Sequence, residues 1–439
     1  MTAEVAILNK TAVALAADSA VTISAGSNQE KIYDSADKLF ELSQYDPIGI
    51  MINNDMHFME APLPVLIKKY RFEGKRFAKI EEAAKDFLAY LHAFGQSAPE
   101  PVRLRHLARQ VSPIVELIQA RIRSAFNRLV ETQDASLRER SIAQVMADQV
   151  SNEIAVVRRW LERSDVATFL GDGDIQLSEA EKAQIAEIVE DTLGVATQDQ
   201  RAEVCQMIVE NVDKIGSAQP TTGVVVAGFG HEELFPTLVS FELYGTIAGR
   251  LKFVQTNHID IDRNGHRARV LPFAQREMVE RFLYGLDEGI EGKVKQFCQS
   301  SVPNIANQIL DRLDMPEADK AVLREEALAA ERGFYEGLAE ESFAAIRQQS
   351  EAEIEDIVEF MPKPEMARMA EALVNLTSIK RRVSRGMETV GGPIDVAVIS
   401  QAEGFVWVKR KHYFPQELNQ RYFDRMRDQI GQHQEADDE

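Results

Sequence analysis

The sequence predicts an α+β protein in which two β-sheets pack face to face between outer helices, as a four-layer α-β-β-α sandwich. Short apolar runs typical of strands occur in three separated blocks, near the beginning, the middle and the end of the 439 residues. Long stretches with helical periodicity separate these blocks. Segregated strands and helices favour packed sheet and helix layers over a parallel βαβ sheet.

The first block begins with two strand pairs. The runs Val5–Leu8 and Ala12–Ala17 are rich in Val, Ile and Ala, and the pair Asn9-Lys10 between them fits a tight hairpin turn. A second pair is expected at Leu39–Leu42 and Ile48–Ile52. Each pair is short enough to be joined by a simple antiparallel connection.

Helical patterns follow, first at 56–70 and 80–94 and then almost without interruption to residue 212. Apolar residues recur at spacings of three and four from Ile114 to Leu129, which indicates one apolar helix face. Three helix starts are expected here, at Ser112 before Pro113 and at capping boxes formed by Ser136 with Glu139 and by Ser178 with Glu181.

Strands return in the middle of the chain and again near its end. They are expected at Thr222–Phe229, Thr237–Leu243, Gly249–Gln255, Ile394–Ser400 and Gly404–Lys409. The long region 274–385 between them is predicted to be helical. Within it, residues 301–360 carry 15 acidic and 5 basic side chains.

One core domain interrupted by two helical insertions follows from this order. The core comprises 2–95, 218–283 and 364–414; the insertions are 96–217 and the acidic 284–363, and an acidic tail covers 415–439. Four of the last six residues of the tail are acidic, so it is expected to be disordered.

Composition excludes several classes of function. With 50 Lys and Arg against 70 Asp and Glu, the net charge is −20, which argues against nucleic acid or an anionic membrane as a partner. The two cysteines, Cys205 and Cys298, exclude a disulfide framework. No apolar run reaches the length of a membrane span, and Glu4 and Asp18 interrupt any signal-peptide pattern. A cytoplasmic location is predicted.

Motifs for metal or nucleotide binding are missing from the sequence. The run Asp260-x-Asp262-x-Asn264-Gly265 resembles the start of a calcium loop, but Leu271 stands where the bidentate Glu belongs, so a turn is expected. There is no phosphate-binding G-x-x-x-x-G-K-[ST] loop, so an intrinsic ATPase is not expected. We predict no metal and no organic cofactor.

Four segments resemble the proteasome β-subunit and its bacterial ATP-dependent relative, which are N-terminal nucleophile (Ntn) hydrolases. TAEVAILNKTAVALAADSAVTIS, from Thr2, resembles the start of the mature subunit. The others are KLFELSQYDPIGIM from Lys38, TTGVVVAGFGHEELFPTLVSFELYGTI from Thr221 and VGGPIDVAVISQAEGF from Val390. They occur in the family's order, and the resemblance covers about 190 of the 439 positions.

The resemblance implies a catalytic set. Thr2, exposed by removal of Met1, would be the nucleophile and its own α-amine the base, because an α-amine titrates near working pH. Lys38 would be the lysine beside the nucleophile and Asp18 the carboxylate that pairs with it. Lys31 competes with Lys38 for this role, but the apolar run after Lys38 continues as the family's strand does.

Further residues are implied around this set. The backbone N–H of Asn53 would stabilise the oxyanion, with Asn53-Asn54 in place of the family's Gly-Gly. Thr22 would contact the substrate backbone, and Met51 would lie at the base of the specificity pocket.

Two other turns depart from the family. Pro272–Gln275 replaces a Gly-Ser-Gly-Ser turn, and 385–391 replaces an Arg-Asp-x-x-Ser-Gly pattern, with Glu388 and Thr389 each displaced by one position. The residues that support the catalytic set are therefore not those of the family.

The expected function is a threonine peptidase or amidase that acts on peptide or protein substrates within a ring or other homo-oligomer. A separate ATPase or a basic partner is a further expected partner. The departures from the family motivate an alternative, a catalytically decayed scaffold that acts through its helical insertions.

Overall fold

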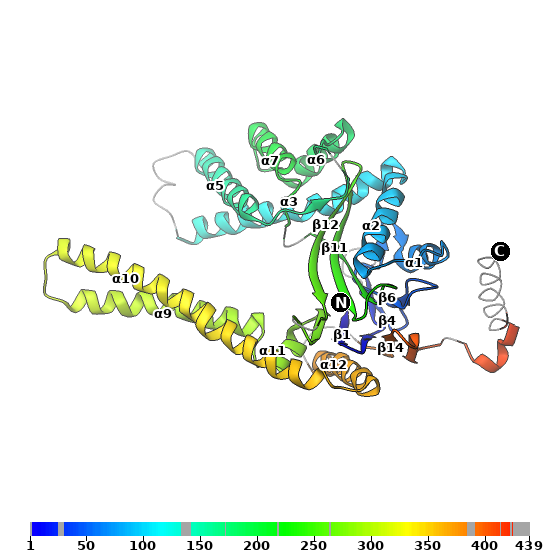
Figure 1. Ribbon diagram of the computed structural model, residues 1–439. Helices are drawn as coiled ribbons and strands as arrows, with labels where there is room; N and C mark the ends of the chain where they lie inside the picture. Colours follow the sequence, from blue (N-terminus) through cyan, green and yellow to red (C-terminus); the bar gives the residue numbers. More distant parts are fainter. Residues whose placement is uncertain are drawn as a thin grey trace.

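The structure is a computed structural model, and it describes residues 2–24, 30–132, 142–171, 173–216, 219–262, 265–383, 391–412, 414–421 and 424 (Figure 1). Two antiparallel sheets form its centre. The first sheet has the order β13 (Ala268–Ala274), β1 (Ala3–Asn9), β2 (Ala12–Ala17), β14 (Asp395–Ser400), β15 (Gly404–Lys409). Strands from all three blocks of the sequence thus meet in one sheet.

The second sheet is six-stranded. Its order is β5 (Leu39–Glu41), β6 (Ile48–Asn54), β10 (Thr222–Gly228), β11 (Thr237–Ile247), β12 (Arg250–Asp260), β9 (Thr168–Phe169). Two short hairpins stand apart, β3 (Val21–Ser24) with β4 (Glu30–Tyr33) and β7 (His57–Phe58) with β8 (Ala61–Pro62). Mixed helices and antiparallel sheets confirm the α+β class.

Successive side chains of a strand point to opposite faces, so each sheet has one apolar face, and these two faces pack against each other. Leu8, Leu15 and Met51 belong to the buried cluster shared by the two sheets. On its other face the first sheet packs against α12 (Lys363–Val383), next to α8 (Glu277–Tyr284) and α11 (Ala345–Val358).

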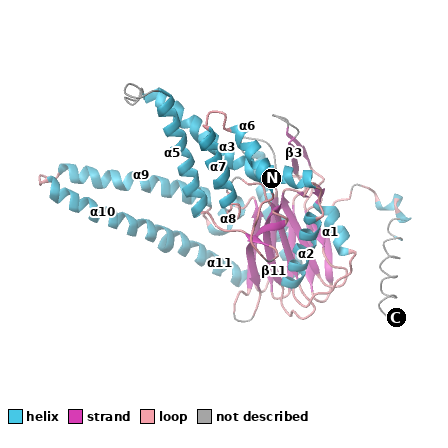
Figure 2. Cartoon of the chain, turned by 90° about the horizontal axis from the view of Figure 1, so that it is seen from above, coloured by secondary structure: helices cyan, strands magenta, loops and turns pink. Residues whose placement is uncertain are grey.

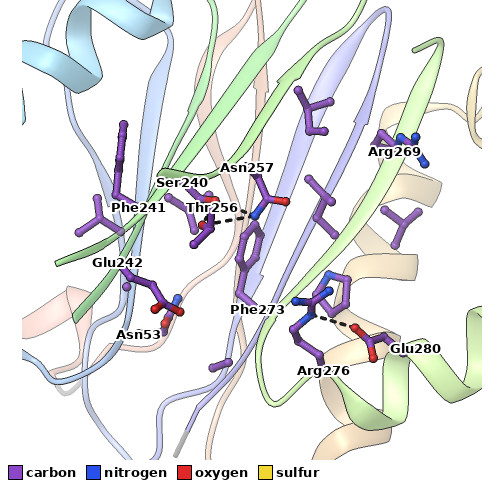
Figure 3. Close-up of a pocket in the computed structure, with 18 of the residues that line it drawn as sticks. Asn53, Ser240, Phe241, Glu242, Thr256, Asn257, Arg269, Phe273, Arg276 and Glu280 are labelled. Atoms are coloured by element: carbon purple, nitrogen blue, oxygen red, sulfur yellow. Dashed lines mark hydrogen bonds and ion pairs between the residues drawn. The ribbon is translucent and has the colours of Figure 1, made fainter. Parts of the chain in front are cut away.

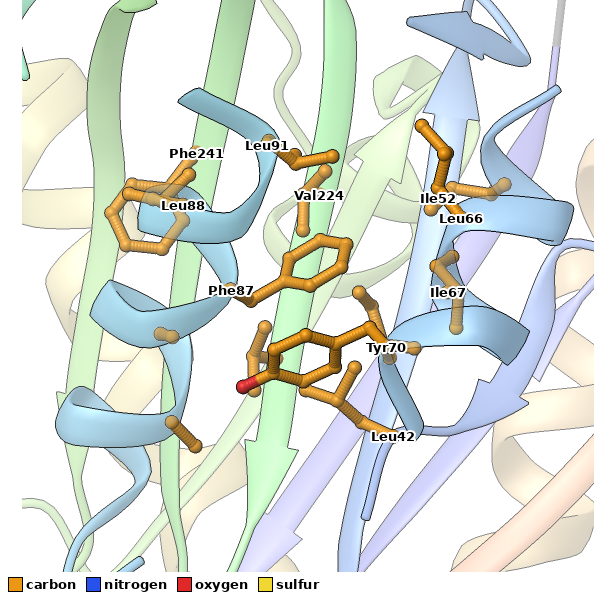
Figure 4. Close-up of a cluster of buried hydrophobic side chains, with 14 of the residues drawn as sticks. Leu42, Ile52, Leu66, Ile67, Tyr70, Phe87, Leu88, Leu91, Val224 and Phe241 are labelled. Carbon is orange, nitrogen blue, oxygen red and sulfur yellow. The ribbon is translucent and has the colours of Figure 1, made fainter. Parts of the chain in front are cut away.

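The outer face of the second sheet is covered by α1 (Leu63–Arg71) and α2 (Ile80–Gln96). Figure 4 shows Phe87 of α2 between Tyr70 of α1 and Val224 of the sheet. The Tyr70 and Phe87 rings meet edge to face, with centroids 5.1 Å apart. This geometry is favourable for the ring quadrupoles.

The first insertion contains α3 (Glu100–Thr132), α5 (Ile142–Arg163), α6 (Glu179–Thr192) and α7 (Gln198–Glu210), which enclose a buried apolar cluster. The predicted capping box of Ser178 with Glu181 is confirmed at the start of α6. Glu181 also accepts a hydrogen bond from the Ala248 N–H at 2.9 Å, which ties α6 to the β11–β12 turn. The insertion is therefore anchored to the second sheet.

The second insertion is a long helical hairpin of α9 (Glu288–Arg312) and α10 (Glu317–Gly337), continued through the π-helical turn η1 (Leu338–Ala344) into α11. It projects away from the sheets in both views (Figures 1 and 2). Only Leu310 of α9 is buried, and α10, all of which the structure describes, buries no residue.

Two predicted helix starts are wrong. Ser112 does not begin a helix, because α3 continues through Pro113 from Glu100. The helix expected at 56–70 begins only at Leu63, since Met59 and Glu60 adopt positive φ in the β7–β8 hairpin. Ser136 and Glu139, residues 263–264 and 384–390, and most of the acidic tail lie outside the described residues.

Helices in the described part of the chain include none that is both long and apolar enough to cross a membrane. Cys205 and Cys298 are free thiols. Among the described residues, no group of three or more His, Cys, Asp or Glu is arranged to hold a metal ion.

Candidate active site

The start of β1 lies at the edge of the buried layer between the sheets. Ala3 and Val5 face α12, whereas Ala6 faces the second sheet. Thr2 and Glu4 share the alternation of Ala6, so their side chains are directed toward the second sheet. Thr2 is 3% exposed, and its carbonyl accepts the backbone N–H of Gln275 at 3.1 Å.

A buried ion pair stands beside this strand. The Lys38 ammonium donates to Asp18 Oδ1 at 2.6 Å, and both side chains are fully buried. The Asp18 carboxylate also accepts the N–H of Ala3 at 3.1 Å and that of Gly391 at 3.0 Å. Because several donors satisfy the carboxylate, the cost of burying both charges is offset.

The hairpin explains why Asp18 reaches this place. Ala17, the last residue of β2, pairs with Glu4, so Asp18 lies beside Ala3 at the open end of the β1–β2 hairpin. Lys38 precedes β5 of the second sheet. The competing Lys31 is exposed, and its ammonium lies 5.0 Å from the centroid of the Tyr33 ring. The structure thus brings Lys38, and not Lys31, to Asp18.

Glu4 is a site residue that the sequence reasoning missed. Its side chain crosses to the second sheet, where Oε2 accepts a hydrogen bond from Asn53 Nδ2 at 3.2 Å, while the buried Oε1 has no partner among the described residues. Burial raises the pKa of Glu4 to about 8, against the opposing influence of Lys38. A single acid inside the apolar strand sequence AEVAILN was the available signal.

Asn53 is placed differently from the prediction. The Ile52 N–H donates to the Lys38 carbonyl at 2.9 Å, so it is directed toward β5. Neighbouring amides of a strand point to opposite sides, which directs the Asn53 N–H toward β10, where Gly223 is its register partner. The predicted use of this N–H as an oxyanion donor is therefore wrong. The Asn53 side chain faces the first sheet instead.

The remaining predicted residues are less closely associated with this cluster. Met51 is fully buried in the layer between the sheets, with Leu39 and Val225 as register partners. Thr22 lies on β3, and its buried hydroxyl has no partner in the part of the chain that the structure describes. Asn54 adopts φ 62, as expected for an Asn that replaces a glycine in a turn.

A cavity of about 410 Å³ opens between the sheets next to this cluster (Figure 3). Asn53 lines it from the second sheet, and Ala274, the register partner of Ala3, lines it from the first. Asn53 thus belongs both to the lining of this cavity and to the buried group of Thr2, Glu4, Asp18, Lys38 and Asn53. Here we call the five residues the β1 polar cluster.

Comparison with known proteins gives no further assignment. No protein-family model matches the chain, and no curated protein matches it either.

Proposed function

We propose that the protein is an N-terminal threonine hydrolase that cleaves peptide or amide bonds after removal of Met1. The observation that carries the proposal is the Lys38–Asp18 pair, which is fully buried and hydrogen-bonded to the residue next to Thr2. A buried cation held at the start of an N-terminal strand suits a nucleophile that must lose a proton.

Packing of the two sheets supports the finer fold proposal. The sheets share a buried apolar cluster, α12 covers the outer face of one and α2 that of the other. We infer that these are the layers of a four-layer Ntn-hydrolase sandwich, whose core is assembled from 2–95, 218–283 and 364–414.

The chemistry follows from one residue carrying both groups. The Thr2 hydroxyl oxygen attacks the amide carbonyl while its proton passes to the α-amine, directly or through water. The leaving amine then takes that proton as the C–N bond breaks, and water hydrolyses the Thr2 ester. The Lys38 ammonium favours the deprotonated hydroxyl and the neutral amine throughout.

Self-association is the second part of the proposal. Phe297, Ile305 and Ile309 of α9 are 70%, 58% and 57% exposed, and α10 also carries exposed apolar side chains, such as Val322 and Leu328. Exposed apolar surface of this extent is typical of an interaction site. The hairpin is the surface through which we propose that copies of the chain associate.

One observation favours the alternative of a catalytically decayed scaffold. The Asn53 N–H is directed into the second sheet, so the expected oxyanion donor is missing from the site. A scaffold protein would retain the helical hairpin and the buried ion pair but would not hydrolyse a substrate.

Two measurements on the purified protein decide between them. Intact mass shows whether Met1 is absent, and a peptide epoxyketone or β-lactone then reports on Thr2. A hydrolase is labelled at Thr2, and the label is lost in Thr2→Ala with the same oligomeric state. Retained Met1, or no label on a free Thr2, contradicts the proposal.

A further inference from the structure

One carboxylate in the cavity has no cation to balance it among the residues that the structure describes. Three arginines line the cavity, and each has a carboxylate partner: Arg269 with Glu351 at 2.7 Å, Arg276 with Glu280 at 2.9 Å, and Arg347 with Glu291 at 2.6 Å. Glu242 forms no ion pair with any residue that the structure describes. Its only hydrogen bond in that part of the chain is a long one from Tyr244 Oη, at 3.4 Å.

The neighbouring polar side chains satisfy one another and not Glu242. Ser240 and Thr256 share a hydrogen bond of 2.7 Å between their hydroxyls, and Asn257 Nδ2 donates to Ser240 Oγ at 2.8 Å. Figure 3 shows this group beside Glu242, whose carboxylate lies next to Asn53. Glu242 is therefore the unneutralised acid of the cavity.

Strand register places Glu242 in line with the β1 polar cluster. Gly223 pairs with Asn53 on one side and with Glu242 on the other, so the three residues form a row across β6, β10 and β11. Two strand spacings, about 10 Å, separate the outer members of the row. Asn53 in turn contacts Glu4, which follows Thr2 by two residues.

Gly223 makes room for the Asn53 side chain. A Cβ atom at position 223 would lie 2.1 Å from Asn53 Oδ1, so no side chain fits there while Asn53 reaches toward Glu4. The Asn53 carboxamide therefore lies over Gly223, in the space that a side chain at position 223 would fill, and Glu242 is the next residue of the row.

We infer that this cavity receives a basic side chain of the substrate, held by Glu242, so that bonds after arginine or lysine are preferred. The inference rests on the proposed hydrolase function, because the side chain belongs to the residue whose carbonyl Thr2 attacks. An arginine guanidinium donates two parallel hydrogen bonds to a carboxylate, which makes it the best match for an unpaired Glu242.

The test compares two fluorogenic tripeptide amides that differ only in the residue before the scissile bond, arginine or its uncharged isostere citrulline. Charge-assisted hydrogen bonds predict that kcat/KM is higher for arginine by a factor of about ten to a hundred. Glu242→Gln should bring the ratio close to one.

The matched control is Glu187→Gln, which removes the same charge from an exposed position on α6. The arginine preference should survive in this variant. If it is lost there as well, net charge rather than Glu242 determines the preference, and the inference is wrong.

A binding measurement separates this inference from the proposed function. Titration of Thr2→Ala with a tripeptide arginine amide and with its citrulline analogue reports on the cavity without chemistry. Tighter binding of the arginine peptide that depends on Glu242 supports the cavity assignment even if Thr2 is never labelled. Equal cleavage or binding of both peptides, or preference for an acidic side chain, overturns it and leaves the hydrolase proposal standing.

Discussion

The two helical insertions have similar secondary structure but opposite packing. The first encloses its own apolar core, with Ile118, Ile154 and Val204 fully buried, and it reaches the second sheet through Ile247. The second buries one residue of α9 and none of α10. Helical periodicity therefore indicates that a segment is helical, but burial decides whether it stabilises the chain to which it belongs.

The second insertion also carries much of the negative charge. Residues 301–360 carry a net charge of −10, half of the total. This stretch includes α11, whose Glu351 pairs with Arg269 of the first sheet, so its charge is shared between the projecting hairpin and a helix that packs on the sheet.

Excision of each insertion should give opposite results. Replacing 111–218 by a short linker removes the carbonyls of Val212 and Lys214 that accept from the buried Lys252, at 2.9 and 2.6 Å, and uncovers Ile247. That variant should fail to fold. Replacing 296–342 by a short linker should leave the core folded. The ion pair between Glu291 and Arg347 holds the two ends of this cut close together. Circular dichroism melts and gel filtration provide the measurement.

Truncation of one side chain in each insertion should also affect stability differently, by a smaller amount than excision. Ile154→Ala in the first insertion should lower the free energy of unfolding by about 2–5 kcal/mol, because it opens a cavity in a packed core. Ile305→Ala, at a position that is 58% exposed, should change it by less than about 0.5 kcal/mol. Denaturant titration of the two variants checks this, and equal effects would remove the distinction between the insertions.

Self-association should depend on the hairpin and not on the first insertion. Ile305→Glu with Ile309→Glu places two charges on one exposed face of α9 and should weaken association by about tenfold or more. The control exchanges exposed Val195 for Glu. Sedimentation at several protein concentrations measures the effect, and unchanged association in the α9 variant contradicts the hairpin as the contact.

The pH dependence of stability tests the core between the two sheets, which the variants of the insertions do not probe. The pKa of Glu4 is raised to about 8 by burial, so the folded protein holds a proton there that the unfolded chain releases near pH 4.5. Stability from this group is complete below pH 4.5 and is lost as the pH rises to about 8. The slope is at most about 1.4 kcal/mol per pH unit.

Glu4→Gln should flatten this slope, as measured by denaturant titration at several pH values between 5 and 8. Glu336→Gln, on the exposed side of α10, should not alter it. A slope that persists in Glu4→Gln would mean that another group takes up the proton.

Most strands were predictable from sequence because their signals are local. Ala12–Ala17, Ile394–Ser400 and Gly404–Lys409 are apolar runs with clear ends, and the prediction of the last two differs from the observed strands by at most one residue. Pro113 misled the prediction, since a proline inside a 33-residue helix removes a single hydrogen bond, and packing of α3 outweighs that loss.

The site was less predictable because its geometry depends on residues far apart in the chain. The proximity of Lys38 and Asp18 was implied by the family resemblance rather than by spacing. Glu4 stands out only as an acid inside an apolar strand, and its contact with Asn53 comes from the packing of the two sheets. Glu242 gave no signal, because its place beside Gly223 and Asn53 depends on the register of three strands. Likewise, the direction of the Asn53 N–H depends on the register of β6.

The place of β14 in the first sheet has a consequence for synthesis of the chain. The β1–β2 hairpin is made first, but its neighbours β13 and β14 are residues 268–274 and 395–400, and the Gly391 N–H that completes the shell of Asp18 comes equally late. At about 5–20 residues per second, the hairpin leaves the ribosome roughly 20 to 80 seconds before β14. The apolar edge of β2 therefore needs protection during translation, and the hydrogen bonds to Asp18 are completed only after Gly391 has been made.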